Sequence, residues 1–348
     1  MAGVDLLGGV SLESRPAEAG AGCSAGATGP CPGDSLAVAH SLVSLVSERR
    51  KQSAQAIAEG ERAVALDPNN AYSAAWLGEV PNYEGRPAEA IGWLEKAMRL
   101  DPRYPFWFAF QLALAYRLTG RYTEAIAAQK QALLRYPNEY SYGQLALIYV
   151  EQWAVQLSQD SQNVEQAVEA AQRAVALSDS LWSAHRALGY VYLYQQQYEQ
   201  AVAEMERAVA LYPNEAVNYA DLAEVLSRVG RVDEALRAAE QALHRKNIVA
   251  DLHLLPTGVA YALAGRDAEA LASLQQFLTR YPDILGAHLT LAAVYSELGK
   301  EAEARAEAAE VLRLNPNFSL EVHKQRVPIK DPVVLERHLA ALSKAGLK

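Results

Sequence analysis

A turn-forming residue recurs about every 34 residues along most of this 348-residue chain. Consecutive turns are 34 or 35 residues apart, except for one interval of 42 between Pro137 and Asp179. A fixed period of this length predicts a stack of similar units, each of which contacts only its neighbours. The turns lie at Pro68, Pro102, Pro137, Asp179, Pro213, Asn247, Pro282 and Pro316.

Within each period, small residues mark two segments that have helical spacing. In the stretch 101–137, Ala113 is followed three residues later by Tyr116, and Ala125 is followed seven residues later by Ala132. Such spacings place the marked residues on one helix face, where a small side chain lets a second helix approach. Gly120 separates the two segments and favours a turn. We therefore predict a helical hairpin in each period, in the pattern of the tetratricopeptide repeat.

The predicted fold is all-α: a right-handed tetratricopeptide superhelix, or α-solenoid, of about eight helix-turn-helix units and a C-terminal capping helix. The array would occupy residues 34–316, with each unit ending near one of the eight turns. Residues 1–33 are rich in glycine and alanine, so we expect them to be disordered. Residues 317–348 form the predicted cap, whose helix runs from Pro332 to about Lys344 and covers the last unit.

Two units depart from the pattern. Pro81 lies inside a first helix, where proline removes a hydrogen bond and costs about 3 kcal/mol, so we expect a kink or an early end there. The fourth unit is eight residues longer than the norm, 42 against 34. The extra residues, 151–163, would lengthen a helix or a loop. Either a function or neutral drift accounts for them.

Composition narrows the classes of partner. The formal charge of −9 argues against nucleic acid, because phosphate binding needs clustered Lys and Arg. No apolar run is long enough to span a membrane, and the N-terminus does not resemble a secretory signal, so we expect a cytoplasmic protein. Cys23 and Cys31 do not have the spacing of zinc ligands. We interpret them as free thiols, with a small disulfide loop as the alternative.

No pattern of catalytic residues is present. The chain lacks a phosphate-binding loop, an HExxH pair and a GxSxG elbow, so we predict no catalytic residues, no metal site and no cofactor. His185 and His288 fall within first helices and are expected to have a packed or half-exposed role rather than bind a metal.

The first helices of such an array line its concave side, where aromatic and arginine side chains suit a protein or peptide partner. For any single ring, packing between units is an equally good interpretation. The candidate groove residues are Tyr72, Trp76, Glu79, Tyr83, Trp107, Phe110, Gln111, Leu114, Arg117, Tyr140, Gln144, Leu147, Arg186, Tyr190, Tyr194, Asp221, Glu224 and Arg228.

Three stretches resemble a particular group of tetratricopeptide arrays, those attached to bacterial class III adenylate/guanylate cyclases. They are RYPFWFAFQLALAYRLTGRYTEAIAA (103–128), YSELGKEAEARAEAAEVLRLNPNFSLE (295–321) and KDPVVLERHLAALSKAGL (330–347). In that family a catalytic domain precedes the repeats, whereas only Met1 to Asp34 precede them here. The resemblance implies a regulatory or partner-binding array without the enzyme. The resulting hypotheses are a non-catalytic adaptor, in signalling for example, a self-assembling structural protein, and, third, part of a cyclase system.

Overall fold

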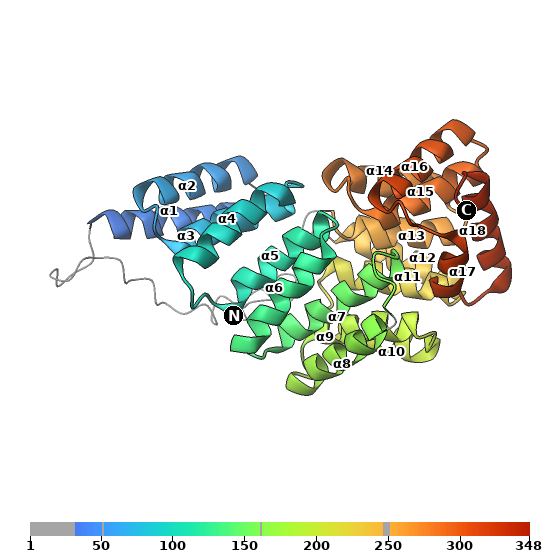
Figure 1. Ribbon diagram of the computed structural model, residues 1–348, viewed down its shortest axis with the longest axis horizontal. Coiled ribbons are helices and arrows are strands. Elements are labelled where there is room, and N and C mark those ends of the chain that lie inside the picture. Colours follow the sequence, from blue (N-terminus) through green and yellow to red (C-terminus); the bar gives the residue numbers. More distant parts are fainter. Residues whose placement is uncertain (1–31, 51, 161, 246–250) are drawn as a thin grey trace. The chain divides into compact units, whose positions relative to one another are not determined.

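The computed structural model describes residues 32–50, 52–160, 162–245 and 251–348. These residues form eighteen α-helices and no strand, and the first sixteen helices form consecutive antiparallel pairs (Figure 1). The all-α, helix-turn-helix prediction is therefore confirmed. The disorder expected for residues 1–33 falls almost entirely outside the described residues, as do Cys23 and Cys31; the first helix begins at Pro32.

The helices divide into two compact units, which are described separately. Unit 1 contains three helical hairpins: α1 (Pro32–Arg49) with α2 (Ser53–Leu66), α3 (Ala71–Tyr83) with α4 (Pro87–Leu100), and α5 (Phe106–Leu118) with α6 (Tyr122–Arg135).

Unit 2 contains five hairpins and two further helices, α17 (Leu320–Arg326) and α18 (Pro332–Lys344). In all eight hairpins the odd-numbered helix is the first. The hairpins of unit 2 are α7 (Glu139–Ala154) with α8 (Gln162–Leu177), α9 (Trp182–Tyr194) with α10 (Tyr198–Leu211), α11 (Ala216–Arg228) with α12 (Val232–His244), α13 (Leu254–Leu263) with α14 (Asp267–Arg280), and α15 (Leu285–Glu297) with α16 (Glu301–Leu314).

The small residues of the first helices allow the two helices of a hairpin to approach closely. A Cβ added to Gly258 would lie 2.6 Å from Cγ of Leu274 on the facing helix, and one added to Gly78 would lie 2.9 Å from Cγ of Leu94. Ala113 is completely buried at the same position of α5. A side chain larger than these would therefore push the paired helices apart.

Pro81 does not shorten its helix. It lies inside α3, which continues to Tyr83 and has 13 residues, as α5 does. Because Pro81 stands in the last turn, the loss of its N–H affects a single hydrogen bond, and its own carbonyl accepts from Glu84 and Arg86. The expected early end of this helix is wrong.

Residues 151–163 lengthen both helices of one hairpin and the loop that joins them. α7 and α8 have 16 residues each, whereas α9 and α10 have 13 and 14. After the C-cap residue Val155, Gln156 adopts a left-handed conformation with φ of 60° although it is buried. A non-glycine residue in this conformation needs contacts that hold it there.

Candidate functional site

The candidate groove residues of unit 1 belong to α3 and α5, whose aromatic rings pack together. The rings of Trp76 and Trp107 stack with centroids 6.4 Å apart, and the rings of Trp107 and Phe108 form a T-shaped pair with centroids 4.4 Å apart. Tyr72 meets Phe108 at 5.5 Å. Trp107 is only 3% exposed, so it serves the contact between consecutive first helices, whereas Tyr72 and Trp76 are half-buried.

Helices α3 and α5 also share a buried amide pair, Asn82 and Gln111. The side chain of Asn82 donates to the backbone carbonyl of Gln111 at 3.0 Å, and Gln111 donates to the hydroxyl of Tyr83 at the same distance. Glu79 and Leu114 are also buried. The candidates of unit 1 that keep exposed surface are therefore Tyr72 and Trp76 on α3, and Phe110 and Arg117 on α5.

In unit 2, five of the candidate residues form one ion-pair network between α9 and α11. Arg186 is paired with Asp221, and the hydroxyl of Tyr190 lies 2.7 Å from Asp221 and 3.0 Å from Glu224. Arg228 donates to Glu224 through two nitrogens, at 2.9 and 2.7 Å. The side chain of Asp221 is 2% exposed, so its charge depends on these partners instead of water.

The electrostatics of the network follow from its burial. Burial, then the carboxylates of Asp221 and Glu224, raise the pKa of Tyr190 well above its usual range, so the hydroxyl keeps its proton and donates it. Burial opposes the charge of Arg186, but the attraction and hydrogen bond of Asp221, together with Tyr190 and Glu151, outweigh burial and raise the pKa of the guanidinium. Each charge in the network is thus matched by an opposite charge of the same chain.

The remaining candidates of unit 2 pack against other helices. The ring of Tyr194 forms a T-shaped pair with Trp153, with centroids 6.2 Å apart, and burial raises the pKa of its hydroxyl to about 12. On α7, Tyr140 packs near Leu181, while Gln144 and Leu147 are buried. The structure therefore joins α9 and α11 through side-chain pairs, and two of the three α7 candidates are buried.

A second set of contacts, which the sequence did not reveal, involves the C-terminal segment, residues 315–348. The guanidinium of Arg326 donates to the carbonyls of Trp153 and Ser158, at 2.7 and 3.0 Å, and lies 4.7 Å above the Trp153 ring. The amide side chain of Gln156 both donates to and accepts from the backbone of Ser319, at 2.9 Å each. Residues 151–163 thus bind a segment about 160 positions further along the chain.

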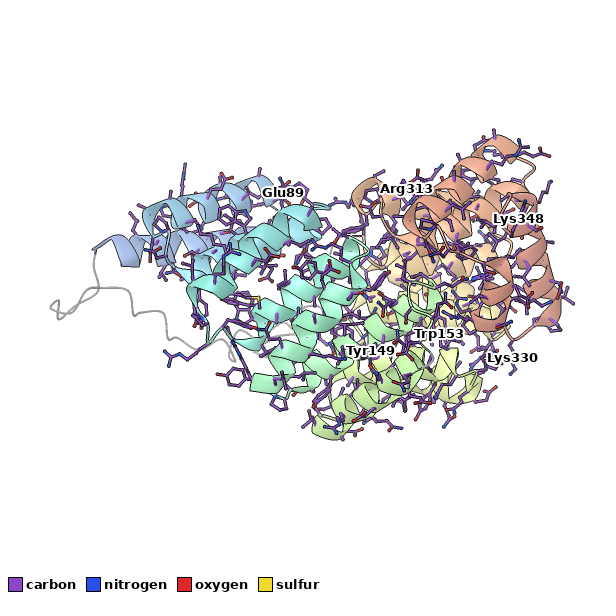
Figure 2. All side chains as sticks on the ribbon, in the orientation of Figure 1. Glu89, Tyr149, Trp153, Arg313, Lys330 and Lys348 are labelled. Carbon is purple, nitrogen blue, oxygen red and sulfur yellow. The ribbon has the colours of Figure 1, made fainter. Side chains whose placement is uncertain are left out.

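The C-terminal segment continues past the carboxyl ends of other first helices. The backbone N–H of Lys330 donates to the carbonyl of Arg228 at 2.8 Å, and Arg337 donates to the carbonyl of Leu263 at 3.1 Å. The last carbonyls of a helix have no partner within the helix and carry its negative dipole, so cationic donors suit them. In Figure 2, Trp153, Lys330 and Lys348 mark this region. α18 packs on α15, as the capping prediction required, but the segment reaches well beyond the last hairpin.

Two histidines meet inside this segment. Nε2 of His323 lies 3.1 Å from Nε2 of His338. Burial, aided by the neighbouring positive charges, lowers the pKa of His323 well below its usual range and that of His338 to about 4. Both rings are therefore neutral near pH 7, and one N–H donates to the other ring nitrogen.

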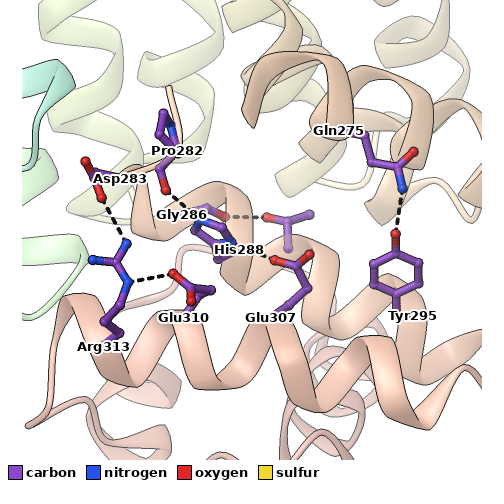
Figure 3. A network of polar contacts seen from close by, with 10 residues as sticks. Gln275, Pro282, Asp283, Gly286, His288, Tyr295, Glu307, Glu310 and Arg313 are labelled. Carbon is purple, nitrogen blue, oxygen red and sulfur yellow. Dashed lines mark hydrogen bonds and ion pairs between the residues drawn. The ribbon is translucent and has the colours of Figure 1, made fainter. Parts of the chain in front are cut away.

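His185 and His288 instead each bridge two acceptors. Nδ1 of His288 lies 2.6 Å from Glu307, and its Nε2 lies 2.8 Å from the carbonyl of Pro282, as Figure 3 shows. His185 repeats this arrangement with Glu204 and the carbonyl of Asp179. Neither acceptor of His288 can donate while the carboxylate is ionised, so the geometry there favours imidazolium. The prediction that these histidines pack is confirmed, since both are buried.

Neither a metal centre nor a membrane span emerges from the described part of the chain. Across residues 32–348, leaving out the gaps, no group of three or more His, Cys, Asp or Glu side chains could hold a metal ion. No helix within the same residues combines the length and apolar character needed to cross a bilayer.

The repeated hairpins define a class of protein, the helical-repeat arrays. Models of the tetratricopeptide repeat match residues 108–139, 182–215, 220–283 and 285–318, so the chain carries tetratricopeptide repeats over these residues. The search of curated proteins found no match.

Solved structures resemble the chain in fold. The Cut9–Hcn1 hetero-tetramer of APC/C matches with a TM-score of 0.54 and 15% identity, over 84% of this chain and 55% of that one. A human IFIT1 dimer with m7Gppp-AAAA matches with a TM-score of 0.52 and 19% identity, over 76% and 68%. A thermophilic tetratricopeptide-repeat protein of Thermus thermophilus is 24% identical over 56% of this chain and 99% of its own, with a TM-score of 0.49. At such identities the likeness concerns the fold alone.

Proposed function

We propose that this chain is a non-catalytic scaffold that binds a protein or peptide partner through the first helices of its repeats. Tetratricopeptide repeats generally mediate contacts between proteins. The observation that carries the proposal is the row of partly exposed aromatic and cationic side chains in unit 1, formed by Tyr72 and Trp76 on α3 and by Phe110 and Arg117 on α5.

These residue types suit a partner that presents apolar side chains. Aromatic rings and arginine are enriched among residues that contribute most to binding. Tyr72 and Trp76 already pack against Trp107 and Phe108, so their orientation is fixed before a partner arrives. A fixed ring loses little conformational entropy on binding.

The test compares three forms of the full chain as affinity baits in lysate of the native cell. Tyr72→Ala combined with Trp76→Ala removes the two partly exposed rings of α3, and Trp93→Ala serves as the matched control because Trp93 is a half-buried ring on the second helix α4. Quantitative mass spectrometry should find proteins held by wild type and by Trp93→Ala but reduced at least tenfold on the double variant. Equal recovery on all three baits would contradict the proposal.

Self-assembly is the alternative function, in which one copy binds another. Light scattering of the purified chain across a hundredfold range of concentration distinguishes self-assembly from partner binding. A partner-binding scaffold is expected to have the same molar mass at every concentration. A role in signalling beside a nucleotide cyclase is a further proposal, supported by the sequence resemblance. A cytoplasmic location stays a prediction of the sequence. Turnover of ATP or GTP by the pure protein would overturn the non-catalytic assignment.

A further inference from the structure

We propose that the carboxyl ends of the first helices of unit 2 form a docking surface for cationic peptides, which the chain's own C-terminal segment occupies. The proposal deepens the binding function by naming a second surface and the chemistry of its ligand. It uses none of the unit 1 side chains, so this proposal and the proposed function can fail independently.

The docking surface is made of acceptors. The carbonyls of Trp153 and Ser158 accept from one guanidinium, and the carbonyls of Arg228 and Leu263 accept from other donors of the C-terminal segment. The carboxylate of Glu199 adds a charge partner, 3.2 Å from Nζ of Lys330. Three of these carbonyls, those of Trp153, Arg228 and Leu263, lie in the last turns of α7, α11 and α13. Carbonyls at helix carboxyl ends carry negative partial charge, which selects cationic ligands.

Aromatic rings add contacts that a guanidinium or an ammonium can use. Arg326 lies 4.7 Å from the centroid of Trp153, and Nζ of Lys330 lies 5.6 Å from that of Tyr198. Between these two cations, Val327, Pro328 and Ile329 are buried. The bound pattern is therefore an arginine, three apolar residues and a lysine, with both cations placed over rings.

Several features of the C-terminal segment resemble those of a bound peptide and not those of a further repeat. α17 has seven residues and is followed by residues 327–330, which lie outside any helix. The segment from Glu321 onward carries six Lys or Arg against three Asp or Glu in a chain whose formal charge is −9. A cationic stretch held by an acidic chain through helix ends is what a competing ligand must match.

The test asks whether the surface accepts the same peptide in trans once the cis contact is weakened. The probe is a fluorescein-labelled peptide with the sequence of residues 321–331, EVHKQRVPIKD, and the readout is fluorescence anisotropy with full-length protein. The cis contact is weakened by Arg326→Ala. Arg313→Ala is the matched control, since Arg313 is an exposed arginine of unit 2 that pairs with Asp283 and Glu310.

We expect the peptide to bind the Arg326→Ala protein at least tenfold more tightly than wild type or Arg313→Ala. A second peptide, with alanine in place of its arginine, should bind at least tenfold more weakly. Equal affinity of all three proteins would overturn the proposal, and so would equal affinity of the two peptides. If circular dichroism shows that Arg326→Ala is unfolded, Gln156→Asn replaces it; this variant loses the paired contact with Ser319, which the probe lacks, and should again bind the peptide more tightly than wild type.

Discussion

The two units use the same hairpin but differ in what their first helices present. In unit 1, α3 and α5 meet through stacked rings and a buried amide pair, and Tyr72 and Trp76 keep exposed surface. In unit 2, α9 and α11 meet through Arg186, Asp221 and their partners. The repeat therefore sets how helices pack within a hairpin, while the residues on the first helices decide whether a surface stays available or is satisfied by the chain itself.

The largest expected effect tests the ion-pair network. Asp221→Ala leaves Arg186 without its carboxylate and should lower the stability of unit 2 by about 3–5 kcal/mol, because an unpaired buried charge is costly. Gln111→Ala in unit 1 removes neutral hydrogen bonds and should cost about 1–3 kcal/mol. Urea unfolding, monitored by the amide hydrogen exchange of α9 and of α5, measures both losses of stability. Equal losses would erase the distinction between the units.

A smaller effect tests what the units share. Gly258→Ala in unit 2 and Gly78→Ala in unit 1 should each destabilise by about 1–3 kcal/mol, since the new methyl group would overlap a leucine of the paired helix. Gly92→Ala is the control: its Cβ meets no atom within 4 Å, and alanine should stabilise α4 by about 0.5–1 kcal/mol. Thermal unfolding monitored by circular dichroism gives the ranking. A stabilising effect at Gly258 would contradict the close packing.

The paired histidines of the C-terminal segment make unit 2 sensitive to acid. The folded-state pKa of His338 is about 4, below the ordinary value near 6.5. The contribution of the neutral ring to folding stability is therefore complete above about pH 6.5 and is lost as the pH falls towards 4. We expect the urea midpoint of wild type to fall between pH 7 and pH 4.5, and to fall less in His338→Leu. An identical fall in both proteins would contradict a buried neutral ring.

The smallest expected effect concerns His288, whose contribution to stability should fall as the pH rises, opposite to that of His338. Burial disfavours the charged form of His288, but its hydrogen bonds to Glu307 and to the Pro282 carbonyl prevail and raise its pKa. Its contribution is then complete below about pH 6.5 and is lost as the pH rises through the raised pKa. The stability difference between wild type and His288→Asn should shrink from pH 6 to pH 9, by less than about 1 kcal/mol. His244→Asn, at an exposed position, is the control variant.

Sequence reasoning was most successful where the determinants are local. The period of 34 residues and the small residues Gly78, Ala113 and Gly258 predicted the hairpins, because helix pairing depends on neighbours a few turns away. Sequence reasoning could not decide which aromatic rings of the first helices are buried by neighbouring helices and which remain partly exposed. Trp107 and Tyr72 occupy comparable positions in the pattern, yet one is buried and the other is partly exposed, since this depends on the adjacent hairpin.

What the sequence alone determined is an all-helical stack of tetratricopeptide hairpins with a helix beginning at Pro332. Only the tertiary structure decided that residues 151–163 hold the C-terminal segment, and that Arg326 binds Trp153 and Ser158. The physical reason is distance along the chain: these partners are about 170 residues apart, and no periodicity relates them. Contacts of this kind arise from the geometry of the assembled helix ends, which becomes defined only when the hairpins have stacked.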